Sequence, residues 1–156
     1  MLIPAIMLVK YSYGQIVINE FMGSNVSALV DTNDYLINSD WIELHNPDPF
    51  SVDIGGYFIS DDLNDNNKWR IPDGLSIGPG EYLIFWADGK DKIPGETDEI
   101  YFTDTTIINI INHHLNFKLS SDGEEIALFD TAGNMVDSIV FGIQKGDIAF
   151  GRNPDN

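Results

Sequence analysis

The chain has 156 residues, enough for one domain with a core of its own. Its residues are 43% hydrophobic, which is too apolar for a disordered chain, and the absence of cysteine excludes disulfides and thiolate metal sites. The formal net charge is −17, from 25 acidic residues against 8 Lys and Arg, and so acidic a surface disfavours binding to nucleic acids and anionic membranes.

The first 15 residues differ from the rest and are typical of a cleaved secretion signal. Residues 1–9, MLIPAIMLV, carry no charged side chain, and Ser12 and Gly14 are small residues at the spacing that a signal peptidase accepts before Gln15. No basic residue precedes the apolar run, so the signal would be incomplete at its N-terminus; a stray N-terminal strand is the alternative. The run is too short to span a membrane as a helix, which takes about 20 residues. We therefore expect a secreted or cell-surface protein without membrane insertion.

The segments after residue 15 have the periodicity of β-strands. Turn residues (Gly, Pro, Asn and Asp) separate them at intervals of roughly 8–14 residues, and no segment has the spacing and caps of an amphipathic helix. The expected strands, in chain order, lie within residues 16–22, 41–44, 52–59, 68–71, 82–87, 117–119, 126–129 and 136–141. This pattern predicts an all-β sandwich of two packed, mainly antiparallel sheets.

The expected core consists of the residues that point inward from these strands. Each contributes about 1.5–3 kcal/mol when fully buried. They are Ile42, Leu44, Ile54, Tyr57, Trp69, Leu83, Phe85, Ile126, Leu128, Ile139 and Phe141.

Residues 40–46, DWIELHN, place two acids and a histidine close together. Alternation along a strand turns Glu43 and His45 away from the face that buries Ile42 and Leu44. A His-x-Glu pair binds a metal only with a further ligand from elsewhere, so a metal-assisted hydrolase is the weaker alternative to a solvated strand face. We expect no catalytic residue here.

The flanking and more distant polar residues fit the same interpretation. Asp40 and Asn46 are expected to bond to backbone amides at the ends of the strand. His113 and His114 are adjacent, so on a strand they face opposite ways and at most one could join Glu43 and His45.

The order of six segments resembles the lamin-tail domain in its bacterial extracellular form. They are IVINEFMGSN, DWIELHNP, VDIGGYFISDD, KWRIPDGLSIGPGEYLIFWADGKD, NFKLSSDGEEIALFD and VDSIVFG. The resemblance covers residues 16–152, which leaves residues 153–156 as the start of a tail or linker.

This resemblance implies an immunoglobulin-like β-sandwich. It also implies a non-catalytic accessory or interaction module of a secreted or cell-surface protein, which is often joined to further domains in a longer chain. The chromatin contacts of the nuclear relatives are not expected here because of the charge of −17.

One loop is a candidate for calcium binding, and no other cofactor is expected. Asp62-x-Asn64-x-Asn66 matches the first oxygen ligands of a calcium loop, although Asn67 stands where that loop has glycine. The alternative is a turn whose side chains accept bonds from backbone amides. The candidate ligands are Asp61, Asp62, Asn64, Asp65 and Asn66.

Aromatic residues in expected loops are the other candidates for binding. Trp69 and Trp86 lie within strands and are expected in the core, whereas Tyr35 and Phe50 lie in loops. We expect Tyr35 and Phe50 to contact an unidentified protein or glycan at the cell surface. A carbohydrate-binding sandwich is therefore the alternative function.

Overall fold

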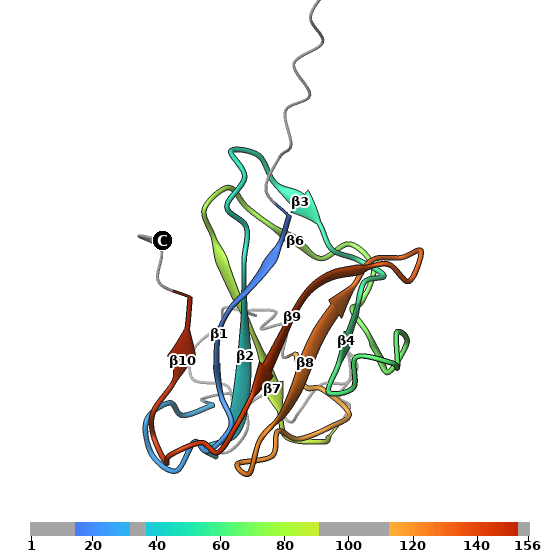
Figure 1. Cartoon of the computed structure of the whole chain (residues 1–156). Helices are drawn as coiled ribbons and strands as arrows, with labels where there is room; N and C mark the ends of the chain where they lie inside the picture. Colours follow the sequence, from blue (N-terminus) through green and yellow to red (C-terminus); the bar gives the residue numbers. More distant parts are fainter. Residues whose placement is uncertain (1–14, 32–36, 91–112, 153–156) are drawn as a thin grey trace, which may run out of the picture.

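The computed structural model describes residues 15–31, 37–90 and 113–152, which form ten β-strands and no helix (Figure 1). The strands are β1 (Val17–Met22), β2 (Asp40–His45), β3 (Val52–Asp53), β4 (Phe58–Ser60), β5 (Trp69–Arg70), β6 (Ser76–Ile77), β7 (Tyr82–Ala87), β8 (Glu124–Phe129), β9 (Met135–Phe141) and β10 (Phe150–Gly151). Accordingly, the described part of the chain offers no helix that could cross a membrane. The predicted signal lies outside the described residues except for Gln15, and the predicted tail lies wholly outside them.

The strands form two sheets of four and a separate small pair. One sheet has the order β10-β1-β2-β7, the other β5-β4-β8-β9, and β3 pairs with β6. Every pair of neighbouring strands is antiparallel. The predicted all-β architecture is confirmed.

One continuous core lies between the two sheets. Ile42 and Leu44 of β2 and Phe85 of β7 meet Ile126 and Leu128 of β8, and all are fully buried. Most of the predicted inward residues are buried, while Tyr57, Leu83, Ile139 and Phe141 are partly buried and pack against this core. The structure adds core residues that the strand pattern did not predict: Ile16, Ile18, Phe21, Ile59, Ile71, Ile77, Ala87, Leu115, Phe117 and Leu119.

Two predicted strands differ in the structure. The expected strand over residues 52–59 is divided into β3 and β4, because the chain turns at Gly56. The φ of Gly56 is 82°, a backbone angle that residues other than glycine rarely adopt. The prediction of a strand over residues 117–119 is wrong. This segment buries Phe117 and Leu119 and lies beside the end of β7, where Lys118 forms only an isolated bridge with Asp88.

Residues 40–45 of the DWIELHN stretch form a strand, as predicted. β2 lies between β1 and β7 in its sheet and turns Ile42 and Leu44 into the core. Trp41, on the opposite face, is also buried, opposite Trp86 in the register. Trp69 is buried in the core as expected, whereas Trp86 is only partly buried.

The polar residues that flank β2 bond to the backbone, which confirms their predicted role. Asp40 Oδ1 accepts a hydrogen bond from the Asn25 backbone amide at 2.8 Å. Asn46 is fully buried, and its Oδ1 accepts from the Asp48 amide at 2.9 Å. These bonds define where the strand begins and ends.

His113 is a buried neutral histidine, so we expect the stability of the domain to fall as the pH is lowered. Its ring centroid lies 5.1 Å from that of Phe85, and burial, aided by the neighbouring His114, lowers the pKa of His113 from 6.5 to about 4. In the unfolded chain this imidazole takes up a proton as the pH falls through 6.5, whereas in the folded chain it stays neutral until about 4. Its contribution to stability is thus present above pH 6.5 and is lost as the pH falls toward 4.

We expect the step from pH 7 to pH 5 to lower the free energy of unfolding by about 2 kcal/mol through His113, at about 1.4 kcal/mol for each pKa unit. Urea unfolding of the wild type and of His113→Leu at both pH values measures this contribution as the difference between their pH dependences. Equal pH dependence in the two proteins would contradict the prediction.

Candidate functional site: an apolar groove between two sheet edges

A groove of about 390 Å³ opens where the edges of the two sheets approach each other. β9 is the terminal strand of one sheet and β10 that of the other (Figure 1). The groove is lined by Phe21, Ile139, Val140, Phe141, Gly142, Ile143, Gln144, Phe150, Gly151 and Arg152. It therefore combines one residue from the start of the described chain with residues from its end.

Three phenylalanines form an aromatic wall along the groove. Phe21 of β1 is buried, and its ring centroid lies 4.4 Å from that of Phe141 and 6.2 Å from that of Phe150. Phe150 is 46% exposed, so the aromatic surface runs from the core out to solvent. Aromatic side chains provide large contact areas at low conformational cost in interfaces.

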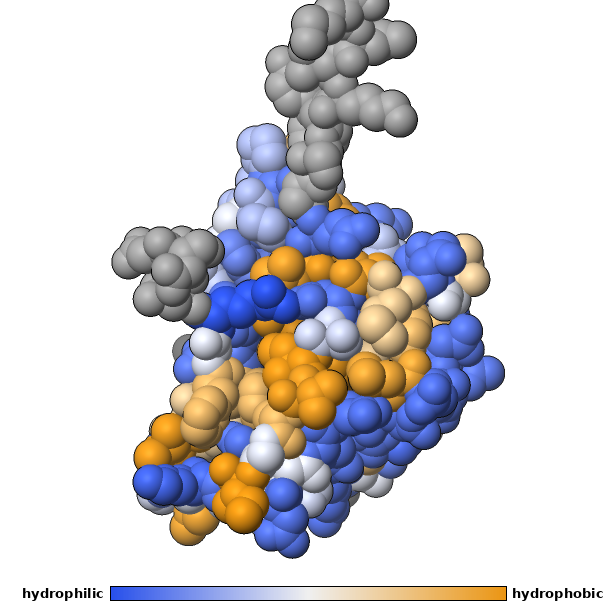
Figure 2. Space-filling view, in the orientation of Figure 1, coloured by the Kyte–Doolittle hydropathy of each residue, from blue (hydrophilic) through white to orange (hydrophobic). Residues whose placement is uncertain are grey.

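The rim of the groove exposes aliphatic side chains. Val140 is 69% and Ile143 78% exposed, and Figure 2 shows apolar residues gathered on this face over β9 and beside β10. Single exposed apolar residues are common on proteins, but a contiguous exposed patch marks an interaction site.

Gln144 supplies a polar atom without a partner inside this apolar lining. Its side chain is 8% exposed, and its Nε2 donates to the Gly142 carbonyl at 2.7 Å. Its Oε1 is buried and accepts no hydrogen bond from the described residues. Because buried acceptors are nearly always paired, this oxygen is a candidate contact for a bound molecule.

An ion pair closes one end of the groove. Arg152 Nη2 lies 2.7 Å and 2.8 Å from the two carboxylate oxygens of Asp137, and its Nε donates to the Ile18 carbonyl. Asp137 Oδ2 also accepts from the Ile18 amide at 2.7 Å, next to the bulge in β1. These contacts join β9, β1 and the residue after β10, and so hold the two sheet edges at a defined separation.

Asp147 anchors the loop between β9 and β10 to the segment that follows β1. Asp147 has a φ of 60°, and its Oδ1 accepts from the backbone amides of Val26, Ser27 and Ala28. Its Oδ2 accepts from the Ser27 hydroxyl, and these bonds, led by that of Ser27, lower the pKa of Asp147 below its usual range. The rim that carries Ile143 and Gln144 is therefore fixed to the β1–β2 connection.

Glu43 and His45, the residues of the hydrolase alternative, have other contacts. Glu43 Oε1 accepts from Asn19 Nδ2 at 2.7 Å, and the His45 ring stacks on Tyr82 with centroids 4.2 Å apart. The two catalytic candidates thus point to different neighbours. Within the described ranges, no group of three His, Asp or Glu side chains is placed to hold a metal ion.

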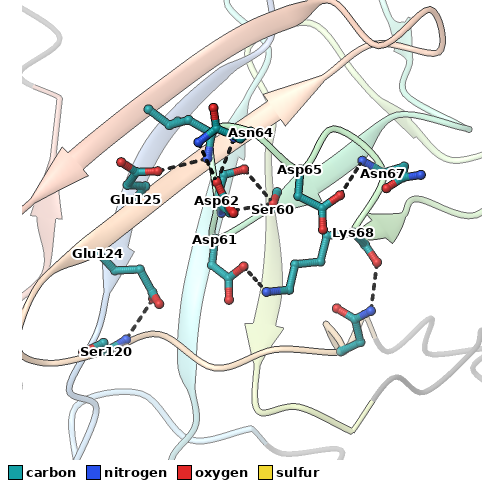
Figure 3. Close-up of polar contacts among 12 residues, drawn as sticks. Ser60, Asp61, Asp62, Asn64, Asp65, Asn67, Lys68, Ser120, Glu124 and Glu125 are labelled. Atoms are coloured by element: carbon teal, nitrogen blue, oxygen red, sulfur yellow. Dashed lines mark hydrogen bonds and ion pairs between the residues drawn. The ribbon is translucent and has the colours of Figure 1, made fainter.

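The acidic loop after β4 has the contacts of a turn (Figure 3). Asp62 Oδ1 accepts from the Asn64 amide at 2.8 Å, and Asp65 Oδ1 accepts from the Asn67 amide at 3.3 Å. Asp61 pairs with Lys68, and Asn66 Nδ2 donates to the Gly133 carbonyl at 3.4 Å. Figure 3 shows Asp61 and Asp65 turned toward different partners.

A calcium ion would have to replace several of these bonds. Calcium binding by Asp61, Asp62, Asn64, Asp65 and Asn66 stays a prediction. A rise in Tm on addition of millimolar calcium would support it, and an unchanged Tm would contradict it.

The two aromatic candidates for a binding surface are placed differently. Tyr35 lies outside the described residues. Phe50 is 43% exposed in the loop after β2 and is not among the groove-lining residues. Carbohydrate binding stays a prediction, which a glycan array with Phe50→Ala as the control tests.

Sequence reasoning did not identify the groove, although one signal was present. Ile139, Val140 and Phe141 are three consecutive apolar residues at the end of one strand. Alternation turns Val140 to solvent when its neighbours face the core, and an aliphatic residue there indicates an exposed contact.

Comparison with known proteins identifies the family of the chain. The model of the Lamin Tail Domain family matches residues 10–142. No match was found among curated proteins. The groove residues Ile143, Gln144, Phe150, Gly151 and Arg152 lie beyond the matched region.

The match covers most of the chain. The two antiparallel sheets agree with the immunoglobulin-like fold of that family. Members of the family are generally not enzymes. The chain therefore belongs to the lamin-tail domain family.

Proposed function

We propose that this lamin-tail domain is a non-catalytic interaction module that binds a partner protein through the groove between β9 and β10. The observation that carries the proposal is the exposed apolar lining across two sheet edges, with Val140 and Ile143 largely open to solvent. Hydrophobic surface left exposed on a domain with a complete core is stabilised by covering it with a partner.

The proposed setting is outside the cell. The apolar start of the chain supports a secretion signal, and the absence of cysteine makes the fold independent of redox conditions. The net charge of −17 favours solubility and disfavours anionic partners. The module would thus connect the protein that carries it to another protein at the cell surface.

A pair of matched valine substitutions tests the function. Val140 in the groove and Val26 outside it are 69% and 66% exposed, so the same change to Asn alters the surface equally at the two positions. We expect wild type and Val26→Asn to retain the same protein from an extracellular fraction of the source organism. Val140→Asn is expected to retain about tenfold less, the effect of replacing an apolar contact of the interface by a polar one. Equal retention by all three proteins, or retention of no protein, would contradict the proposed function.

A further inference from the structure

The geometry points to one class of occupant for the groove: an extended peptide segment with alternating apolar side chains, flanked by Lys or Arg, that donates an N–H to Gln144 Oε1. This inference rests on the proposed function and specifies its partner. Three independent features of the groove carry it.

The first feature is the position of the groove between two strand edges. β9 and β10 are each the last strand of their sheet in the described part of the chain, and Phe21, Phe141 and Phe150 lie between them. An extended peptide beside a strand edge gains main-chain hydrogen bonds, and its alternate side chains enter the apolar space. A helical segment would satisfy its own backbone groups and leave the strand edges unused.

The second feature is the unpartnered oxygen of Gln144. The bond from Nε2 to the Gly142 carbonyl at 2.7 Å sets the orientation of the side-chain amide, so the groove offers an acceptor rather than a donor. This oxygen is already buried without a partner among the described residues, so an occupant that donates a hydrogen bond here gains a bond that an occupant without a donor does not. The backbone N–H of an extended peptide supplies that donor.

The third feature is the negative charge around the groove. In the register of β1 and β10, Glu20 lies opposite Gly151 of the groove lining, and the chain as a whole carries a formal net charge of −17. Arg152, the basic residue of the lining, is paired with Asp137. Basic residues that flank the apolar segment would be attracted to Glu20 and to the net negative charge of the chain.

The same charge argues against a second copy of this chain as the occupant. Two copies would each carry a formal charge of −17, and bringing identical acidic edges together costs repulsion. A partner segment of opposite charge has the reverse effect and binds faster at low salt.

A random peptide library tests the occupant directly. Phage-displayed dodecapeptides are selected on the immobilised full chain and counter-selected on Val140→Asn, with Val26→Asn as the matched control. We expect the enriched peptides to alternate apolar residues and to carry Lys or Arg at their ends. A synthetic copy of the most enriched peptide is expected to bind about tenfold more weakly to Val140→Asn and about fivefold more weakly to Gln144→Met. The unchanged Tm of each variant would show that it is folded.

The outcomes separate this inference from the proposed function. Enriched peptides that are acidic, that lack alternation or that bind Gln144→Met as well as wild type overturn the inference. An empty selection overturns it as well, and so does a dimer of the free chain in light scattering that Val140→Asn dissociates. In each case the proposed function stands as long as wild type retains an extracellular protein that Val140→Asn retains less. If Val140→Asn does not change that retention, the proposed function fails as well.

Discussion

Replacing His114 with alanine is expected to lower the free energy of unfolding by about 3–5 kcal/mol. His114 is fully buried, with its Nδ1 2.8 Å from Asp88 Oδ2 and its Nε2 3.4 Å from Asp31 Oδ2. Asp31 is also fully buried. Removing the imidazole takes away the group that lies between two carboxylates in a low-dielectric interior, where a broken polar contact costs far more than at the surface.

The matched control is His45→Ala. His45 is only partly buried and stacks on Tyr82 at 4.2 Å, so its loss is expected to cost about 0.5–1 kcal/mol. Urea unfolding of the two variants measures this difference. Similar losses for His114→Ala and His45→Ala would show that the buried cluster is not a major source of stability.

The fold could be predicted from the sequence because its signals are local. In β2, alternation within six residues decides which side chains meet the core, and Ile42 and Leu44 are buried as that alternation requires. The same logic fails for Phe117 and Leu119. Their apolar pattern predicts a strand, but the chain at that point forms only isolated bridges beside the end of β7 and buries its side chains without a continuous ladder.

The two buried histidines show the limit of local reasoning more sharply. Adjacency correctly predicts that His113 and His114 have different surroundings, but not that both are buried. The carboxylates near His114 come from residues 26 and 83 positions away in the chain, and no periodicity connects them. Such a cluster can be identified only once the strand order is known.

The groove could not be predicted for a related reason. Phe21 lies near the start of the domain and Phe150 near its end, and they come together only because β10 pairs with β1. Gln144 is a polar residue in a connecting loop, where exposure is the ordinary expectation. Its backbone amide donates to the Ser121 carbonyl at 2.7 Å, and Asp147 holds the same loop to the amides of residues 26–28; sequence spacing reveals neither contact.

Changing Asn46 to aspartate is expected to lower the free energy of unfolding by about 3–4 kcal/mol at pH 7, although the two side chains have nearly the same shape. Asn46 is fully buried, and its Nδ2 lies 2.8 Å, 2.8 Å and 3.0 Å from the carbonyl oxygens of Phe50, Ile77 and Gly78. A carboxylate would turn an acceptor toward these oxygens, so that attraction becomes repulsion in a site without access to water.

The expected loss depends on pH in a defined direction. A buried Asp facing carbonyl oxygens has a raised pKa in the folded chain, so Asn46→Asp should be less destabilised at pH 5, where the acid can take up a proton and donate, than at pH 7. Asn116→Asp adds the same charge at an exposed residue whose Nδ2 donates to the Lys68 carbonyl, and it is expected to cost under about 1 kcal/mol at either pH. Urea unfolding of both variants at the two pH values makes the comparison. Equal losses of unfolding free energy in the two variants would contradict the prediction. They would mean that backbone bonds, rather than the Asn46 side-chain amide, hold the loop after β2.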